Sequence, residues 1–109
     1  MKKMKVGLIG LRFNADKAVN TVAINLPECS KILSVSAKDE NNEPCLWVNY
    51  MALSEYFDHK VGYAEKAWSK FQFVIVRCDY GEFEFDEHKY ISTIELGKDA
   101  FAIFYKKAK

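Results

Sequence analysis

The residues best suited to chemistry lie in one acidic stretch, residues 79–87. If residues 82–86 are extended, Glu82, Glu84 and Asp86 share one face at intervals of roughly 6.6 Å, and two phenylalanines occupy the other face. A row of carboxylates repels itself unless water or cations neutralise it. The pattern therefore predicts an acidic strip that binds Lys or Arg on another protein. The alternative is an edge strand that its charges protect from pairing with other chains.

Catalytic and metal-binding groups are few. The three cysteines form no C-x-x-C pair, which argues against a zinc knuckle, and the chain has no G-x-S-x-G nucleophile motif. Cys45 and Cys78 fall within predicted strands, where a thiol behaves as a small inert hydrophobe. We predict that His59 and His88 are exposed turn residues, and Asp86 with His88 would supply only two of a metal's ligands. We therefore expect a protein that is not an enzyme and that has no cofactor or metal.

A second group of candidate contacts is aromatic and lies where the two-residue alternation stops, at residues 53–70. Apolar residues recur there at helical spacing, so the pattern predicts one short amphipathic helix over about residues 55–70. A long loop is the alternative. Aromatic side chains inside a polar rim are typical of protein interfaces. We therefore expect the exposed part of this segment to bind a protein, through Tyr56, Phe57, Tyr63 and Trp68.

Alternation of apolar and polar residues dominates the rest of the chain and predicts antiparallel strands. The strongest strand is expected at residues 71–77, whose middle is apolar on both faces, as in a central strand. Residues 30–50 predict a β-hairpin around a polar turn, and residues 97–99 predict a second tight turn. Further strands are expected over residues 6–11, 18–26, 82–85, 90–96 and 100–105.

These elements predict a mainly β fold. We expect an antiparallel β-sandwich or partly open barrel of roughly six to seven strands with at most one short helix. An α+β fold, with the helix packed on an antiparallel sheet, is the alternative. The chain of 109 residues has room for a single domain spanning residues 1–109.

Charge and composition restrict the partners and the compartment. The 16 Lys and Arg nearly cancel the 15 Asp and Glu, and a net charge of +1 argues against a nucleic-acid partner. The apolar run at residues 6–11 is shorter than the core of a signal peptide and far shorter than a membrane span, so we expect no membrane association. An odd number of widely spaced cysteines favours a reducing compartment, and we expect a cytoplasmic protein.

Three stretches of the first half carry a resemblance to a family. They resemble a group of small, largely phage-encoded domains of unknown function, in which a strand ending in Pro precedes an ILSV strand, a polar turn and a PCLW strand. The stretches are AINLP (23–27), KILSVS (31–36) and EPCLW (43–47). In the second half, YISTI (90–94) is similar to that family's YIGT strand. The chain departs from the family after the central strand, where T-G-H is usual, and in the last strand, where Trp-His is common.

The resemblance implies a bacteriophage accessory protein made in the cytoplasm of an infected bacterium. We predict that it acts by stoichiometric binding of a host protein, with counter-defence inhibition as one form of this function. Two alternatives stay open. A protein that sequesters a nucleotide signal would use Arg12, Arg77 and Trp47 as its cationic and aromatic groups. A structural or virion-associated protein would self-associate, for instance as a homodimer.

Overall fold

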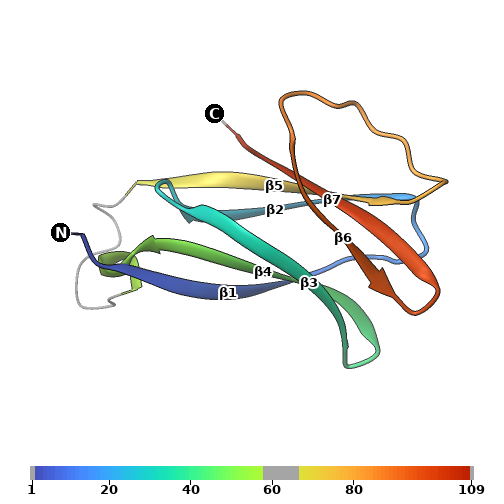
Figure 1. Cartoon of the computed structure of the whole chain (residues 1–109), viewed down its shortest axis with the longest axis horizontal. Coiled ribbons are helices and arrows are strands. Elements are labelled where there is room, and N and C mark those ends of the chain that lie inside the picture. The colour runs from blue at the N-terminus through green and yellow to red at the C-terminus, as the bar shows by residue number, and fades with distance from the viewer. Residues whose placement is uncertain (1, 58–66, 109) are drawn as a thin grey trace.

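The computed structural model describes residues 2–57 and 67–108. These residues form two antiparallel sheets that face each other (Figure 1), a three-stranded sheet in the order β1-β4-β3 and a four-stranded sheet in the order β2-β5-β7-β6. The two sheets do not close into a barrel, so the predicted mainly β fold is confirmed in its sandwich form. The elements are β1 (Met4–Arg12), β2 (Val19–Pro27), β3 (Lys31–Glu40), β4 (Glu43–Leu53), the 3-10 helix η1 (Ser54–Phe57), β5 (Trp68–Arg77), β6 (Lys89–Leu96) and β7 (Asp99–Lys107).

Two tight turns set the register of the hairpins. Asn41 and Asn42 join β3 to β4 with φ angles of 52° and 66°, the left-handed pair that a two-residue type I′ turn requires. Asparagine tolerates this region better than most residues. In the other hairpin, Leu96 pairs with Asp99, which leaves a two-residue turn that begins at Gly97 with a φ of 64°. Both turns predicted from the sequence are confirmed.

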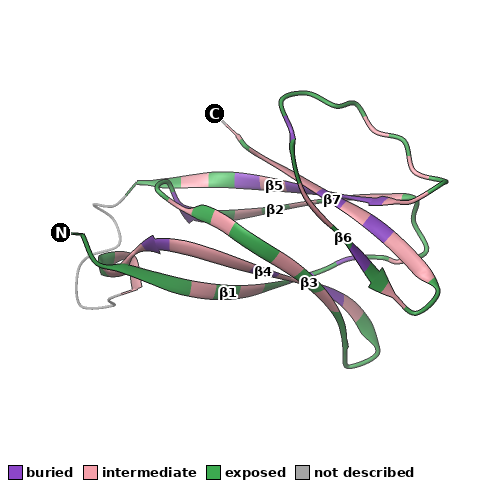
Figure 2. Cartoon of the chain, in the orientation of Figure 1, coloured by how far each residue is buried: buried purple, intermediate pink, exposed green. Residues whose placement is uncertain are grey.

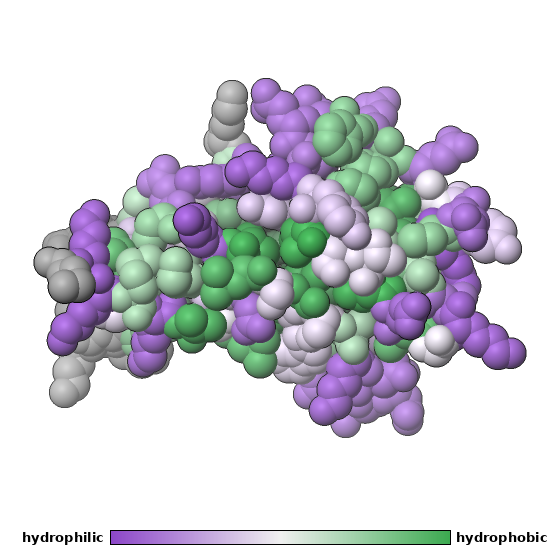
Figure 3. All heavy atoms as spheres, in the orientation of Figure 1, coloured by the Kyte–Doolittle hydropathy of each residue, from purple (hydrophilic) through white to green (hydrophobic). Residues whose placement is uncertain are grey.

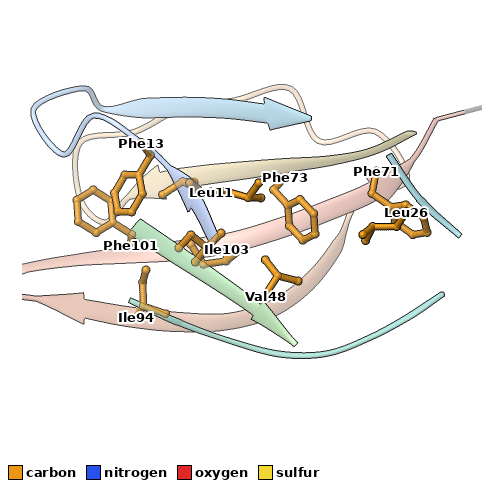
Figure 4. Close-up of a cluster of buried hydrophobic side chains, with 11 residues drawn as sticks. Leu11, Phe13, Leu26, Val48, Phe71, Phe73, Ile94, Phe101 and Ile103 are labelled. Atoms are coloured by element: carbon orange, nitrogen blue, oxygen red, sulfur yellow. The ribbon is translucent and has the colours of Figure 1, made fainter. Parts of the chain in front are cut away.

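The hydrophobic core lies between the two sheets (Figure 4). Because successive side chains of a strand point to opposite faces, alternate residues of each strand enter this layer. β5 lies between β2 and β7, which confirms its predicted central position. The three-stranded sheet, with the residue that follows β1, contributes Leu11, Phe13, Leu46 and Val48. The four-stranded sheet contributes Leu26, Phe71, Phe73, Ile75, Ile94, Phe101 and Ile103.

One predicted element is wrong, and a second is wrong at its C-terminal end. Residues 82–85 belong to no strand, because the segment 78–88 lies over the outer face of the four-stranded sheet without joining its ladder. Among the described residues of the predicted helix, residues 55–57 lie in the helical turn η1, and residues 68–70 begin β5 by pairing with the end of β2. Strand pairing with β2 outweighs the helical spacing of the aromatic residues. The rest of that prediction, residues 58–66, lies outside the described residues.

Candidate protein-binding surface

The acidic stretch belongs to a segment that is fixed at both ends. The Cys78 N–H donates to the Ala100 carbonyl at 2.9 Å, and the Gly81 N–H donates to the Arg77 carbonyl at 2.8 Å, as the chain leaves β5. Asp79 and Glu87 have φ angles of 75° and 57°, so a left-handed residue turns the chain near each end of the segment. The segment therefore follows a defined path, although beyond the Cys78 hydrogen bond to Ala100 it belongs to no strand.

Gly81 lets this segment approach the sheet closely. A Cβ atom at this position would lie 2.6 Å from the Ala18 carbonyl oxygen and 2.6 Å from the Val76 Cγ1 atom, both well inside contact distance. Only glycine leaves room for the backbone to pack there. Val76 points away from the core layer but is nevertheless buried, and its contact with Gly81 accounts for part of that burial.

The segment is held on the sheet by an aromatic cluster centred on Phe104 of β7. The ring centroids of Phe83 and Tyr90 lie 4.8 Å and 5.5 Å from that of Phe104, and the centroid of Phe85 lies 6.1 Å from it. Phe83 is half-buried, whereas Phe85 is 65% exposed and Tyr90 is 57% exposed. The rings of Phe85 and Tyr90 therefore expose a large apolar area to solvent while they pack against Phe104.

His88, the last residue of the segment, packs against the rings of Phe83 and Phe85. Its ring lies 5.4 Å from that of Phe83, and its Nδ1 atom accepts a hydrogen bond of 3.0 Å from the Asp86 N–H. The side chain is 9% exposed, so the prediction of an exposed turn residue is wrong. The other histidine, His59, lies outside the described residues. His88 acts here as a structural residue that ties the turn at Asp86 to the aromatic rings.

The predicted acidic strip lies beside these exposed rings. Glu82, Glu84 and Asp86 are all exposed, and they alternate with Phe83 and Phe85 along the segment. Asp86 lies 3.5 Å from the Lys106 Nζ atom, while Glu82 and Glu84 make no ion pair with any residue that the structure describes. In the upper part of Figure 3, where this segment runs, apolar residues lie among strongly hydrophilic ones. We call this region, Glu82–Asp86 with Tyr90 and Phe104, the acidic-aromatic surface.

The other predicted contacts form a separate cluster. The Tyr56 ring packs edge-on against Trp68 at 5.6 Å, and the Phe57 ring stacks on Tyr50 at 5.9 Å. η1, which carries two of these residues, lies at the opposite end of the molecule from segment 78–88 (Figure 1). Tyr63 lies outside the described residues. The predicted contact residues therefore do not form one continuous surface.

The sequence analysis missed Phe104 and Tyr90 as members of the surface. Phe101, Ile103 and Tyr105 of β7 face the core. Because successive side chains of a strand point to opposite faces, Phe104 lies on the outer face of β7. An aromatic residue at an outward position of a strand is a signal that something covers that face. This signal was present in the sequence, but without the strand order it could not be connected to the acidic stretch.

The groups proposed for a nucleotide do not converge. Arg77 binds Asp99 and donates a hydrogen bond of 2.7 Å to the Ala15 carbonyl, so it serves to close the end of the four-stranded sheet. Arg12 lies 2.8 Å from Glu43 in the other sheet. Trp47 lies on the outer face of that same sheet, where it lines a shallow hollow. Among residues 2–57 and 67–108, no three His, Cys, Asp or Glu side chains are grouped to hold a metal ion.

Burial makes the Cys45 thiol unreactive. Desolvation raises the pKa of Cys45 above its ordinary value of 9.0, and the negative charge of Glu40 raises it further. The thiol is therefore protonated at neutral pH and is a poor nucleophile. Cys78 lies one residue beyond β5 and is half-buried, so its predicted place inside a strand is wrong, whereas Cys29 is exposed.

We expect this difference to appear in thiol labelling. At neutral pH, Cys29 should react with a chromogenic disulfide at least about tenfold faster than Cys45, which should react only as the protein unfolds. The folded state holds the Cys45 proton more tightly than the unfolded chain does. The contribution of Cys45 to the free energy of unfolding should therefore be constant at neutral pH and fall as the pH rises above 9.0. Equal labelling rates for Cys29 and Cys45 in the native protein would contradict this burial.

Comparisons with known proteins do not add to this description. No protein-family model matches the chain, and no curated protein or solved structure matches it either. Among the helical residues that the structure describes, none form a helix long and apolar enough to cross a membrane.

Proposed function

We propose that this protein acts without catalysis, by stoichiometric binding of a partner protein through the acidic-aromatic surface. The observation that carries this proposal is the pair of exposed rings, Phe85 and Tyr90, that contact Phe104, together with the exposed carboxylates of Glu82 and Glu84, which have no ion-pair partner among the described residues. Aromatic anchors at the centre of a polar rim are where most of the binding energy of an interface resides.

The charge of the rim defines the chemistry of the partner. Five of the nine residues at 79–87 are Asp or Glu, and among the described residues only Asp86 has a cation, Lys106, within ion-pair distance. A partner with a patch of Lys or Arg around an apolar depression would neutralise these carboxylates and accept the rings. Because Gly81 and His88 already fix the segment, little conformational entropy would be lost on binding.

The resemblance of the hairpin to small phage-encoded domains makes a bacterial host protein the partner that we propose. In this account the protein is a phage accessory protein that works in the host cytoplasm. Occupying the basic surface of a host factor would inhibit or redirect that factor. Counter-defence inhibition is one form of this function.

Charge reversal tests the role of the acidic rim. We expect the double variant Glu82→Lys and Glu84→Lys to bind the partner at least about tenfold more weakly, because two attractive contacts become repulsive. The partner is first captured from host lysate on the immobilised protein and identified by mass spectrometry, and its affinity is then measured by calorimetry. The matched control is Asp39→Lys with Glu40→Lys, two adjacent exposed carboxylates at the β3 end of the other sheet.

The two variants separate the outcomes. Binding that is lost in the Glu82/Glu84 variant and kept in the Asp39/Glu40 variant supports the proposed surface. Binding that survives the reversal at Glu82 and Glu84 contradicts it, and equal loss in both variants would mean that only net charge matters.

A second candidate function has one observation in its favour. The indole Nε1 of Trp47 is buried without a hydrogen-bond partner among the described residues, beside a hollow on the outer face of the three-stranded sheet. A small planar ligand in this hollow would stack near the indole ring. Denaturing the purified protein and analysing the supernatant distinguishes the candidates, since a nucleotide released in equimolar amount would favour the ligand-binding function.

A further inference from the structure

Among the residues that the structure describes, β1 is an edge strand with no hydrogen-bond partner on its outer side. At its two ends, the Phe13 N–H donates to the Pro44 carbonyl and the Ser54 N–H donates to the Lys3 carbonyl. In an antiparallel pair, hydrogen-bonded and non-hydrogen-bonded positions alternate. The odd-numbered residues of β1 therefore bind β4, and the even-numbered residues point their N–H and C=O groups away from the sheet. These are Met4, Val6, Leu8, Gly10 and Arg12.

The side chains beside this free edge are apolar and exposed. Val6 is 59% exposed and Leu8 is 61% exposed, and the first half of β1 is coloured as exposed in Figure 2. Lys5 is odd-numbered, so its side chain lies on the other face, where its Nζ atom sits 5.7 Å from the centre of the Phe57 ring. The outer face of β1 therefore has no charge from Met4 to Gly10.

The other three edge strands, β2, β3 and β6, have features that hinder pairing with another chain. β3 has a bulge after Ile32 and four charged residues, and β6 has a bulge after Tyr90. β2 ends in Pro27, and its exposed side chains are small or polar. Bulges, charges and proline are the usual means by which an edge avoids pairing with another chain. β1 is paired to β4 without a register shift and has neither a bulge nor a proline.

We propose that β1 is a homodimer interface, at which β1 of a second copy pairs antiparallel across a two-fold axis at Leu8. Every even-numbered residue then faces another even-numbered residue, for example Val6 opposite Gly10 of the second copy. This register forms about ten main-chain hydrogen bonds, two for each facing pair of even-numbered residues. That number is usual for a stable protein interface.

Charge and symmetry also favour this register. Lys5 faces Leu11 of the second copy and Arg12 faces Met4, so no like charges are directly opposed. The contact is self-complementary, as a two-fold interface must be, and it closes after two copies. The two three-stranded sheets would become one six-stranded sheet, in the order β3-β4-β1-β1-β4-β3. β1 belongs to the sheet opposite the one that carries the acidic-aromatic surface, so the two surfaces are distinct.

Sedimentation equilibrium of the purified full chain tests this interface without any partner. We expect the wild type to have about twice the 12.6 kDa mass of one chain. Leu8→Lys should be monomeric because it places two like charges opposite each other on the axis. Leu8→Pro should also be monomeric, since it removes an N–H that β4 does not use. The matched control, Leu33→Lys, changes an exposed leucine of β3 in the same sheet and should stay dimeric.

Circular dichroism confirms that each variant is folded before its mass is compared. A wild type that stays monomeric up to about 1 mM would overturn the proposal, because even a weak complex forms at that concentration. A dimer that persists in both Leu8 variants would overturn it too, and so would a wild type that forms open chains larger than a dimer. None of these outcomes bears on partner binding, which uses the other sheet.

Discussion

Replacing Phe101 with alanine should lower the free energy of unfolding by about 3–5 kcal/mol, the cost of a large cavity in a packed core. Phe101 is fully buried, and its ring packs edge-on against that of Phe13 at 5.5 Å. The Arg77 guanidinium also lies 5.8 Å from the centre of the ring, so the deletion removes a contact of the side chain that joins β5 to Asp99 of β7. Urea unfolding followed by far-ultraviolet circular dichroism measures the loss.

Leu33→Ala is the control for this measurement. Leu33 is 47% exposed and lies on β3, away from the free edge of β1, so its truncation should change the free energy of unfolding by no more than about 0.5 kcal/mol. A loss below about 1 kcal/mol for Phe101→Ala would contradict the core described above, because it would mean that the ring is not enclosed by both sheets.

Replacing Phe85 with alanine should weaken partner binding at least about thirtyfold, which corresponds to the roughly 2 kcal/mol typical of a central interface residue. Phe85 is the most exposed ring of the Phe104 cluster and lies between Glu84 and Asp86. Because it is 65% exposed, its loss should leave the unfolding transition almost unchanged. Titration calorimetry with the identified partner measures the affinity.

Tyr80→Ala is the matched control for Phe85→Ala. Tyr80 is on the same segment and is 76% exposed, but it packs beside the Arg77 guanidinium at 5.9 Å and outside the Phe104 cluster. We expect its removal to change the affinity less than about threefold. If Tyr80→Ala and Phe85→Ala weaken binding equally, the anchor is not the ring that rests on Phe104.

The elements that could be predicted from the sequence are those with a local cause. Hairpin turns depend on a few residues, and Asn41, Asn42 and Gly97 adopt the left-handed conformations that their types favour. The central position of β5 followed from apolar residues on both faces. In the structure its inner face meets the core, and Val76 of its outer face meets Gly81.

The elements that could not be predicted depend on contacts between distant parts of the chain. Alternation of Phe83 and Phe85 with acidic residues shows only that the segment is extended, not whether it pairs in a sheet or lies over one. Its position depends on Phe104 and on the close approach at Gly81, both set by strand order. The start of β5 could not be predicted for the same reason, because its partner strand β2 is remote in sequence.

The same limit applies to the candidate surface. The carboxylates of the strip were identified because acidic residues alternate within a few positions. Phe104 and Tyr90 come from β7 and β6, and only the fold brings them under the strip. The sequence thus predicts the charge that the proposed partner would carry, and the structure adds the exposed rings that would supply the apolar contact.

Site-specific photo-crosslinking tests most directly whether this surface binds a protein. p-Benzoylphenylalanine would replace Phe85 in the acidic-aromatic surface and, in a second sample, the exposed Thr21 of β2. After irradiation in host lysate, we predict an equimolar adduct with one host polypeptide from position 85 and none from position 21. No adduct from position 85, or the same adducts from both positions, would contradict the proposed function.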